Sequence, residues 1–274
     1  MTVPEIILND GHSIPQLGFG LFRVDVDETQ RIAELAIEAG YRHFDDAKIY
    51  GNEEGLGRAI AASGLPREDF FITTTLWQDD QGREAPHRAI DASLERLGLD
   101  YVDLYLIHWP HPSDGLAADT WLAFEEIRDA GRARSIGVSN FREVDLAGLA
   151  RRSSTVPAVN QIELHPRFQQ RPLRAEQEGR GIRTEAWGPL GHGRYAAGEL
   201  PEVVAIGEAH GVSGAQVVLR WLLQEGVIVF PKSSTAARIR ENFDVFGFEL
   251  SDAELATIRG LDDGTRVGRD PAEN

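Results

Sequence analysis

The sequence contains no cysteine, one methionine and only two lysines, Lys48 and Lys232, among its 28 basic residues. Without cysteine there can be no disulfide framework, no thiolate nucleophile and no cysteine-ligated zinc or iron–sulfur site. No apolar run approaches the roughly 20 residues of a membrane-spanning helix, and the first residues lack the basic-then-apolar layout of a signal peptide. We therefore expect a cytoplasmic protein with no membrane partner.

Positive charge is also scarce, because 28 Lys and Arg face 44 Asp and Glu for a formal net charge of -16. A surface of this sign repels the phosphate backbone, which argues against nucleic acid as a partner. Any anion that binds must meet a local group of cations. Lysines retained in a chain so rich in arginine are candidates for functions that need a compact ammonium group of tunable pKa.

The 274 residues alternate short β-branched runs with segments of helical period about eight times, without a linker. The extended runs are 17–20, 42–45, 70–74, 102–107, 133–138, 157–161, 182–187 and 226–230. The clearest helical segments are 28–39, 86–97, 119–130, 142–152 and 213–225. This alternation predicts parallel strands joined by right-handed crossovers, and hence a closed (β/α)₈ TIM barrel forming a single domain over residues 1–274.

A doubly wound open sheet is the main competing fold. It would usually carry a G-x-G-x-x-G loop after its first strand, whereas this chain reads GFGLFR there. The residues before that strand read instead as a β-hairpin turning at Asp10 and Gly11, which could close the bottom of a barrel. Gly40 is suited to a left-handed helix end, and Ser213 to a helix N-cap.

Polar residues cluster where the predicted strands end, which is where chemistry is found in such barrels. They are Asp45 with Tyr50, Thr75 near Trp77, His108 beside Trp109, and Ser139, Asn140 and Gln161. Each one alone is typical of a cap or a satisfied core polar group. Their recurrence at successive strand ends predicts a site.

Six motifs follow one another in a recognisable order: HFDDAKIYGNEEGLGRAI, DLYLIHWP, IGVSNF, NQIELHP, WGPLG and PKSSTAARIRENFDVF. Together they resemble the aldo-keto reductase family over nearly the whole chain, and the short loops look most like its bacterial 2,5-diketo-D-gluconate reductase branch. The resemblance implies reduction of aldehydes and ketones with NADPH by an Asp, a Tyr, a Lys and a His.

On this resemblance Tyr50 is the general acid, His108 orients the carbonyl, and Asp45 is the buried carboxylate that pairs with the lysine. Thr75 stands where the family has that lysine. A phenol titrates near 10, so it needs electrostatic help to donate its proton efficiently. Without the ammonium group, we expect the pKa of Asp45 to rise and the reductase to be slow.

Lys48 lies three residues after Asp45, at a position that varies among the relatives. If the segment forms one helical turn, residues 45 and 48 face similar directions, and Lys48 could supply the missing ammonium group. The alternative is that Lys48 points to solvent. The sequence is compatible with both orientations of Lys48.

The resemblance also assigns a cofactor site for NADPH/NADP⁺. Ser139, Asn140 and Gln161 hold the nicotinamide carboxamide, Trp187 stacks on its ring, and the loop with Gly188, Leu190 and Gly191 follows the pyrophosphate. Two cations and a hydroxyl near a helix start suit the 2′-phosphate. These are Lys232, Ser233 and Arg238, with Glu241 and Asn242 at the adenine. Phe22, Trp77 and Trp109 line the substrate pocket.

We therefore expect a monomeric reductase of small-molecule carbonyls, including keto-sugar acids. Two alternatives remain at this stage. One is a barrel that binds NADPH with little or no catalysis and acts as a sensor or in protein interactions. The other is different chemistry at Lys48, such as Schiff-base formation.

Overall fold

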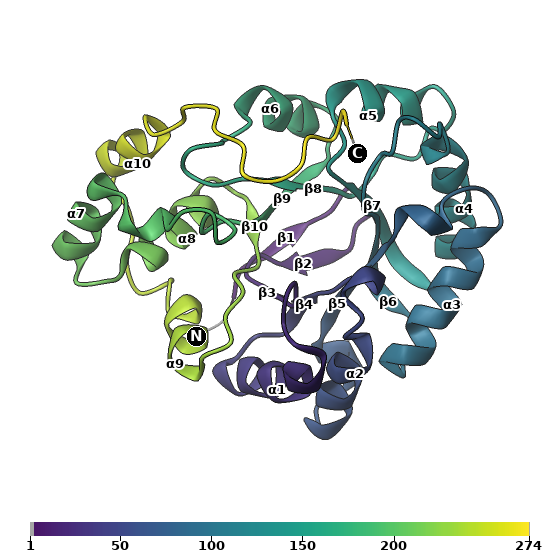
Figure 1. The fold of residues 1–274 in the computed structure, drawn as a ribbon, viewed down its shortest axis with the longest axis horizontal. Helices are drawn as coiled ribbons and strands as arrows, with labels where there is room; N and C mark the ends of the chain where they lie inside the picture. Colours follow the sequence, from purple (N-terminus) through teal and green to yellow (C-terminus); the bar gives the residue numbers. More distant parts are fainter. Residues whose placement is uncertain (1–2, 274) are drawn as a thin grey trace.

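The computed structural model describes residues 3–273 and shows a (β/α)₈ barrel (Figure 1). Eight parallel strands pair in chain order, and all eight predicted extended runs are confirmed. The strands are β3 (Phe19–Gly20), β4 (His43–Asp45), β5 (Phe71–Leu76), β6 (Val102–Ile107), β7 (Ala133–Ser139), β8 (Val159–Glu163), β9 (Arg183–Trp187) and β10 (Ile228–Val229). Leu17 bridges to Val229 in parallel, and the Gly18 amide donates to the Val229 carbonyl at 2.8 Å, which closes the sheet.

Helices surround the strands, as the periodicity predicts. The five predicted helices are α1 (Thr29–Ala39), α3 (Ala85–Leu97), α4 (Ala117–Asp129), α5 (Glu143–Ala150) and α8 (Gly214–Gln224). Gly40 ends α1 with φ 112°, and the Ser213 side chain caps α8, as expected. Helix α9 (Ala236–Phe243) begins where a helix start was expected beside Lys232, Ser233 and Arg238. Helices not predicted are α2 (Glu53–Ala62), α6 (Arg171–Gly179), α7 (Pro201–His210) and α10 (Asp252–Arg259). No described helix is long and apolar enough to cross a membrane.

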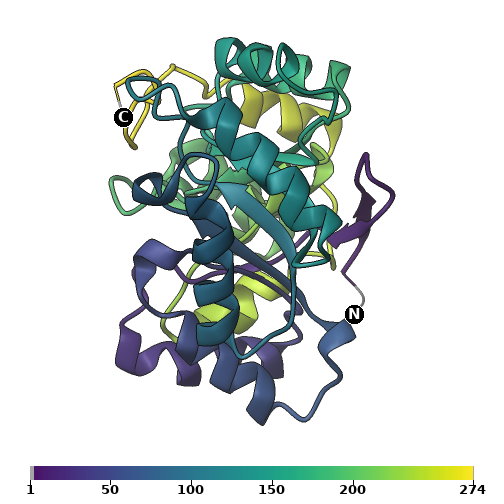
Figure 2. The same ribbon diagram turned by 90° about the vertical axis from the view of Figure 1, so that its right-hand side faces the viewer.

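The N-terminal hairpin closes one end of the barrel, as predicted. Strands β1 (Glu5–Ile7) and β2 (Ser13–Pro15) pair antiparallel with Ile6 opposite Ile14. Ile14 is fully buried and belongs to a cluster with Phe71, Leu104 and Val159 from the barrel strands. In Figure 2 the hairpin lies on the side opposite the segment after α10. Because the hairpin precedes the first barrel strand and covers the N-terminal ends of the strands, the C-terminal ends that carry the predicted site lie at the opposite end of the barrel.

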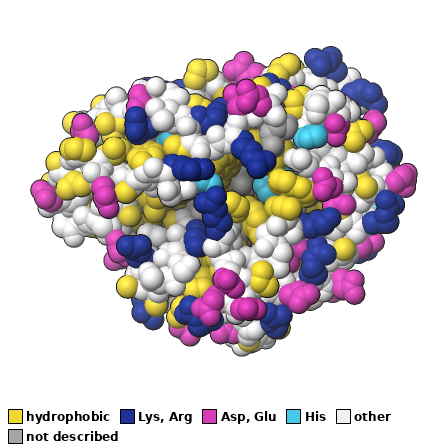
Figure 3. All heavy atoms as spheres, in the orientation of Figure 1, with side chains coloured by type: hydrophobic (Ala, Val, Ile, Leu, Met, Phe, Trp, Pro, Cys, Tyr) yellow, Lys and Arg dark blue, Asp and Glu magenta, His cyan; other side chains and the backbone are white. Residues whose placement is uncertain are grey.

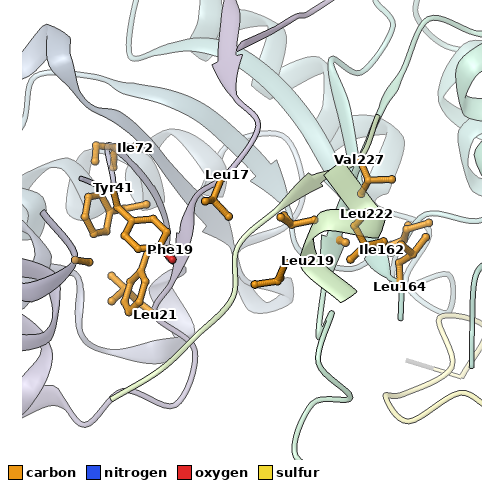
Figure 4. Close-up of a cluster of buried hydrophobic side chains, with 14 of the residues drawn as sticks. Leu17, Phe19, Leu21, Tyr41, Ile72, Ile162, Leu164, Leu219, Leu222 and Val227 are labelled. Atoms are coloured by element: carbon orange, nitrogen blue, oxygen red, sulfur yellow. The ribbon is translucent and has the colours of Figure 1, made fainter. Parts of the chain in front are cut away.

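The main core joins the inner strands to the surrounding helices. Figure 4 shows Phe19, Leu21, Tyr41 and Ile72 in one part of it, and Ile162, Leu164, Leu219 and Leu222 in another. All eight side chains are buried to within 2 % of full burial. This close packing fixes the backbone of the strands, so the polar residues at their ends are held by a rigid frame.

Candidate active site

The predicted catalytic residues meet at the C-terminal ends of neighbouring strands. Asp45 ends β4, and Tyr50 ends the short 3₁₀ turn η2 (Lys48–Tyr50) that follows. Thr73 of β5 is in register with Asp45, so Thr75, two residues further along the strand, presents its side chain on the same face of the sheet. His108 follows β6, and its ring centroid lies 6.0 Å from that of Tyr50.

Asp45 is buried and has an amide for a partner. One oxygen accepts a hydrogen bond from Gln161 Nε2 at 2.8 Å, and the same nitrogen donates to Glu185 Oε2 at 3.2 Å. Burial raises the pKa of Asp45 to about 7, against the lowering effect of the Gln161 bond. Burial likewise raises the pKa of Glu185 to about 8, with a further contribution from Asp45. Two carboxyl groups thus share one amide.

Thr75 brings a hydroxyl group, and no charge, to this cluster. Its Oγ1 donates to the Asp46 carbonyl at 3.1 Å. The Asp46 side chain is fully buried, with Oδ1 accepting from the Ala47 amide and Oδ2 unpartnered. Burial, followed by the nearby Glu53 charge, raises the pKa of Asp46 well above its ordinary value. Glu53 itself accepts a hydrogen bond from Arg96 Nε at 2.7 Å.

Lys48 does not pair with Asp45 in the structure. Its ammonium group forms an ion pair with Asp80, in the turn η4 (Gln78–Asp80) after β5. The physical reason is local, because Ala47 is extended with φ -155° and ψ 144°. The helical turn therefore starts only at Lys48, and residues 45 and 48 do not belong to one turn. The single turn that would have aligned these two residues is not formed.

Tyr50 and His108 have desolvated surroundings. Burial raises the pKa of Tyr50 well above its ordinary value, and the charges of Asp45 and Asp46 raise it further. Burial lowers the pKa of His108 to about 4, so its imidazole is neutral at pH 7. Its Nδ1 is buried without a hydrogen-bond partner. The pair can therefore offer a phenol proton and a neutral imidazole to a ligand.

Asn140 connects three strand ends. It follows β7 with φ 63°, a left-handed backbone that is uncommon outside glycine and frequent at functional sites. Its Nδ2 donates to the His108 carbonyl at 2.9 Å, and its Oδ1 accepts from Trp187 Nε1 at 2.8 Å. Ser139 Oγ donates to the Gln161 carbonyl at 2.9 Å. The predicted carboxamide-binding residues therefore lie together.

Aromatic rings form a row across the mouth of the barrel. His192 packs edge-on to Trp187 at 5.2 Å and stacks on Phe22 at 5.3 Å, and Phe22 lies 5.0 Å from Tyr50. At the other end of the row, Trp77 and Trp109 pack on His108 at 5.2 and 6.4 Å. The predicted pocket residues are thus neighbours of the predicted acid. Sequence reasoning missed His192, because no periodicity marks a residue in an irregular loop.

Cations gather on the same face. Figure 3 shows basic side chains around a hollow at its centre, despite the acidic composition. Within residues 3–273, Arg23, Arg194, Lys232 and Arg238 form no ion pair. Desolvation, and then the Arg23 charge, lowers the pKa of Lys232. Cations held together without acidic partners are suited to an anionic ligand such as a phosphate.

The residues predicted to contact the rest of a dinucleotide lie at helix α9. Ser233 is buried, and its Oγ accepts from the Thr235 amide at 3.2 Å just before the helix. Arg238 is exposed on the first turns, Glu241 is partly exposed and Asn242 is buried. In the loop after β9, Gly188 and Gly191 have φ 63° and 91°, and Leu190 between them packs against the core.

Three further residues were missed although two of them lie in the NQIELHP motif. Glu163 and His165 are buried and bonded to each other at 3.0 Å, and Tyr195 bonds to His165 at 2.8 Å. The signal in the sequence was a charged residue and a histidine directly after an apolar strand. Their partners are distant in the chain, so the sequence could not show what they hold.

Comparisons with known proteins agree with this geometry. The model of the Aldo/keto reductase family matches residues 16–263. An aldo-keto reductase of Mycolicibacterium smegmatis is 52% identical over 268 residues, covering 98% of this chain and 97% of that protein. Methylglyoxal reductase DkgA of Yersinia pestis is 46% identical, covering 98% of this chain and 96% of that protein. The solved structure of a Gox0644 mutant in complex with NADPH superposes with a TM-score of 0.95 at 42% identity, covering 100% of this chain and 99% of that one.

The family match spans most of the chain, and the relatives align from end to end. The residues that meet at the strand ends are those on which the sequence resemblance rests. This chain belongs to the aldo/keto reductase family.

Proposed function

We propose that this protein is an NADPH-dependent oxidoreductase that reduces the aldehyde or ketone group of a small molecule, with Tyr50 as the general acid. The observation that carries the proposal is the placement of Tyr50 and His108 side by side at the barrel mouth, with aromatic rings on both sides. A phenol proton and a neutral imidazole that lie side by side suit a carbonyl oxygen.

The described residues fit NADPH. Unpaired Lys232 and Arg238 offer charge to a 2′-phosphate. Asn140 and Gln161, which we expect beside the carboxamide, lie together at the strand ends and are held there by hydrogen bonds to Trp187 and Asp45. The N–H of Trp187 is bonded to Asn140, which fixes the orientation of the indole that we propose to stack on the nicotinamide. When bound, the cofactor supplies a hydride to the carbonyl carbon.

The protein residues then handle the oxygen. His108 orients the carbonyl through a hydrogen bond, and Tyr50 transfers its phenolic proton to the oxygen as negative charge develops there. The C=O double bond becomes an alcohol, and Tyr50 is left as a phenolate that takes a proton back from solvent. Asn140 keeps the strand ends that carry His108 and Trp187 in register.

We infer that the reaction is slow, because Thr75 occupies the position that the resemblance assigns to lysine. The influences on Tyr50 are burial and two carboxylates, and all of them raise its pKa. A donor whose pKa lies further above the operating pH transfers its proton less readily. Lys48 is held by Asp80, so the pairing also gives no support to Schiff-base chemistry at its ammonium group.

The substrate proposal is a keto acid or keto sugar acid, in keeping with the 2,5-diketo-D-gluconate reductase-like branch. The support is that Arg23 and Arg194, neither of which forms an ion pair with a described residue, both lie near His192. Desolvation is the largest cause of the lowered pKa of His192, and the charges of these two arginines lower it further. A carboxylate bound near the mouth would offset the repulsion between these cations.

The test is Tyr50→Phe, which keeps the ring and removes the proton. Reduction of an aldehyde panel should fall by about 10²–10⁴-fold, the usual contribution of general acid catalysis. NADPH affinity, measured by quenching of tryptophan fluorescence, should stay unchanged. Full activity of the variant would refute the assignment, whereas tight NADPH binding with no turnover in the unchanged protein would favour the sensor alternative.

A further inference from the structure

Glu163 is a fully buried carboxylate for which the proposed chemistry has no use. It ends β8, and its side chain has no exposed surface. Oε1 accepts hydrogen bonds from His165 Nε2 at 3.0 Å and from the Val267 amide at 2.6 Å, and Oε2 accepts one from the Gly268 amide at 3.0 Å. Although burial raises its pKa, these hydrogen bonds together lower it below the ordinary value. Glu163 is therefore charged in the folded protein.

The amides that Glu163 binds belong to the segment after helix α10. Residues 263–268 of this segment are also held by Arg167, whose carbonyl accepts from the Thr265 amide at 3.1 Å. The segment lies directly on Trp187, because a Cβ added to Gly268 would come within 2.2 Å of the indole and within 2.7 Å of Glu163 Oε2. Only glycine permits this approach without displacing one of the two.

The second partner of Glu163 leads to another element over the site. His165 Nε2 donates to the carboxylate, and His165 Nδ1 is hydrogen-bonded to the Tyr195 hydroxyl at 2.8 Å. In a neutral imidazole this Nδ1 is the acceptor and the hydroxyl is the donor. Tyr195 belongs to the loop 188–196 after β9. The same loop places His192 against Trp187 and Phe22. One buried carboxylate thus reaches both the loop and the 263–268 segment.

We propose that Glu163 is a positioning residue that ties the 263–268 segment and the 188–196 loop to one point beside Trp187. Through its own oxygens it holds the segment, and through His165 and Tyr195 it holds the loop. The functional consequence rests on the function proposed above. The loop would cover the cofactor and the segment would form a wall of the substrate pocket, so Glu163 would set cofactor release and substrate fit together.

Three variants distinguish the two connections of Glu163, one to the 263–268 segment and one to the 188–196 loop. Glu163→Gln keeps the size of the side chain but loses the charge that three donors share, and should loosen both elements. Tyr195→Phe removes only the hydroxyl that binds His165 and should loosen the loop alone. Gly268→Ala would bring a Cβ against Trp187 and Glu163 Oε2, and should displace mainly the segment that carries it. Glu254→Gln is the matched control. Like Glu163, Glu254 binds a histidine (His210, 2.8 Å) and a backbone amide (Ser251, 2.7 Å), but it lies on helix α10 and contacts neither the 188–196 loop nor the 263–268 segment through these bonds.

Hydrogen exchange of the backbone amides is the first measurement. We expect Glu163→Gln to speed exchange at least about tenfold in both 188–196 and 263–268, the loss typical of hydrogen bonds to a charged group. Tyr195→Phe should speed exchange in the loop only, and Glu254→Gln in neither. Unchanged exchange in both elements for a folded Glu163→Gln would overturn the proposal. If Glu163→Gln does not fold, Tyr195→Phe carries the test, and unchanged loop exchange in it would overturn the proposal.

Kinetics is the second measurement. Glu163→Gln should raise both the NADPH dissociation rate and the KM for a carbonyl substrate, Tyr195→Phe mainly the first, and Gly268→Ala mainly the second. If Tyr195→Phe and Gly268→Ala change both constants equally, the 188–196 loop and the 263–268 segment do not act separately, which contradicts the proposal. If the unchanged protein reduces no carbonyl while Glu163→Gln still speeds exchange as expected, the proposed function fails and the positioning role stands.

Discussion

Returning a lysine to position 75 should both stabilise the site and speed the reaction. Thr73 of β5 is in register with Asp45, and Thr75 lies two residues further along β5, so its side chain is on the same face of the sheet as that of Asp45. A lysine there would reach toward the Asp45 carboxyl. At present that carboxyl has the Gln161 amide as its hydrogen-bond partner.

The magnitude follows from the pKa of Asp45, which burial raises from 3.8 to about 7. At 1.36 kcal/mol per pKa unit, ionising Asp45 costs the folded state about 4 kcal/mol relative to the unfolded chain. Because the folded pKa is the higher one, the folded state keeps a proton that the unfolded chain has released between about pH 4 and about pH 7. Stability is therefore lost as pH rises through this window, and the full penalty is present above about pH 7.

An ammonium group beside Asp45 favours the ionised carboxylate and lowers the pKa of Tyr50. In Thr75→Lys the fall in unfolding free energy between about pH 4 and about pH 7 should therefore shrink by up to about 4 kcal/mol. The part due to Glu185, with a pKa of about 8, should remain. Carbonyl reduction should rise at least about tenfold, which corresponds to about 1.4 kcal/mol of transition-state stabilisation.

Denaturant unfolding across this pH range, and turnover of one aldehyde at saturating NADPH, measure the two effects. Thr75→Met is the control, because it fills similar space without charge. An equal gain in Thr75→Met would show that filling space matters and charge does not. If Thr75→Lys changes neither the pH dependence nor the rate, the reasoning about the missing cation is wrong.

Three further predictions concern the charges around the site. Lys48→Ala should leave turnover within about twofold and cost less than about 1 kcal/mol in unfolding free energy, because its ion pair with Asp80 is partly exposed; a large loss of turnover, with no gain from a lysine at position 75, would instead make Lys48 the substitute ammonium. Arg238→Ala should weaken NADPH binding at least about tenfold and NADH binding little, as measured by fluorescence titration; equal weakening would place the 2′-phosphate elsewhere. Turnover of the unchanged protein should decline as pH rises through about 7, since ionised Asp45 makes the general acid a poorer donor; a profile that rises over this range would contradict the assignment, and Asp45→Asn should flatten it.

Strands β5 and β6 were the most predictable, because every residue in them is buried and each contains a short run of β-branched or apolar residues. Strand β9 (RTEAW) is less apolar, and it was recognisable mainly from its place in the alternation of strands and helices. Helix α2 was not, because Gly55 and Gly57 interrupt its periodic pattern and reduce its helix propensity. Helix α6 is similar, since its nine residues bury only Gln177 and give no apolar stripe. Packing against the barrel stabilises α2, whereas α6 is tied to β9 by a hydrogen bond from Thr184 Oγ1 to Gln177 Oε1 at 2.7 Å. The sequence displays neither contact.

The sequence could indicate which residues gather at the strand ends, but not which of them form hydrogen bonds or ion pairs with one another. Asp45, Tyr50 and His108 could be placed because parallel strands end at one edge of the barrel. The partner of Lys48 could not, because one extended residue at position 47 redirects the chain toward Asp80, 32 residues away. The role of Glu163 depends on amides more than 100 residues further along the chain.

These pairings suggest how the fold accommodates a site without its cation. A buried carboxylate without a positive partner is costly, and the usual escape is to bind a proton. Asp45, Asp46 and Glu185 all have raised pKa values, and no described cation pairs with any of them. Near pH 6 Asp45 and Glu185 would therefore hold their protons for most of the time, while the unpaired arginines and lysine outside remain positive. These protons remove negative charge beside Tyr50, so the proposed acid is a better donor below about pH 7 than above it. Holding the proton on Asp45 costs stability from about pH 4 upward, because the unfolded chain has already released it. The pH that favours the proposed acid is therefore not the pH at which the site is most stable.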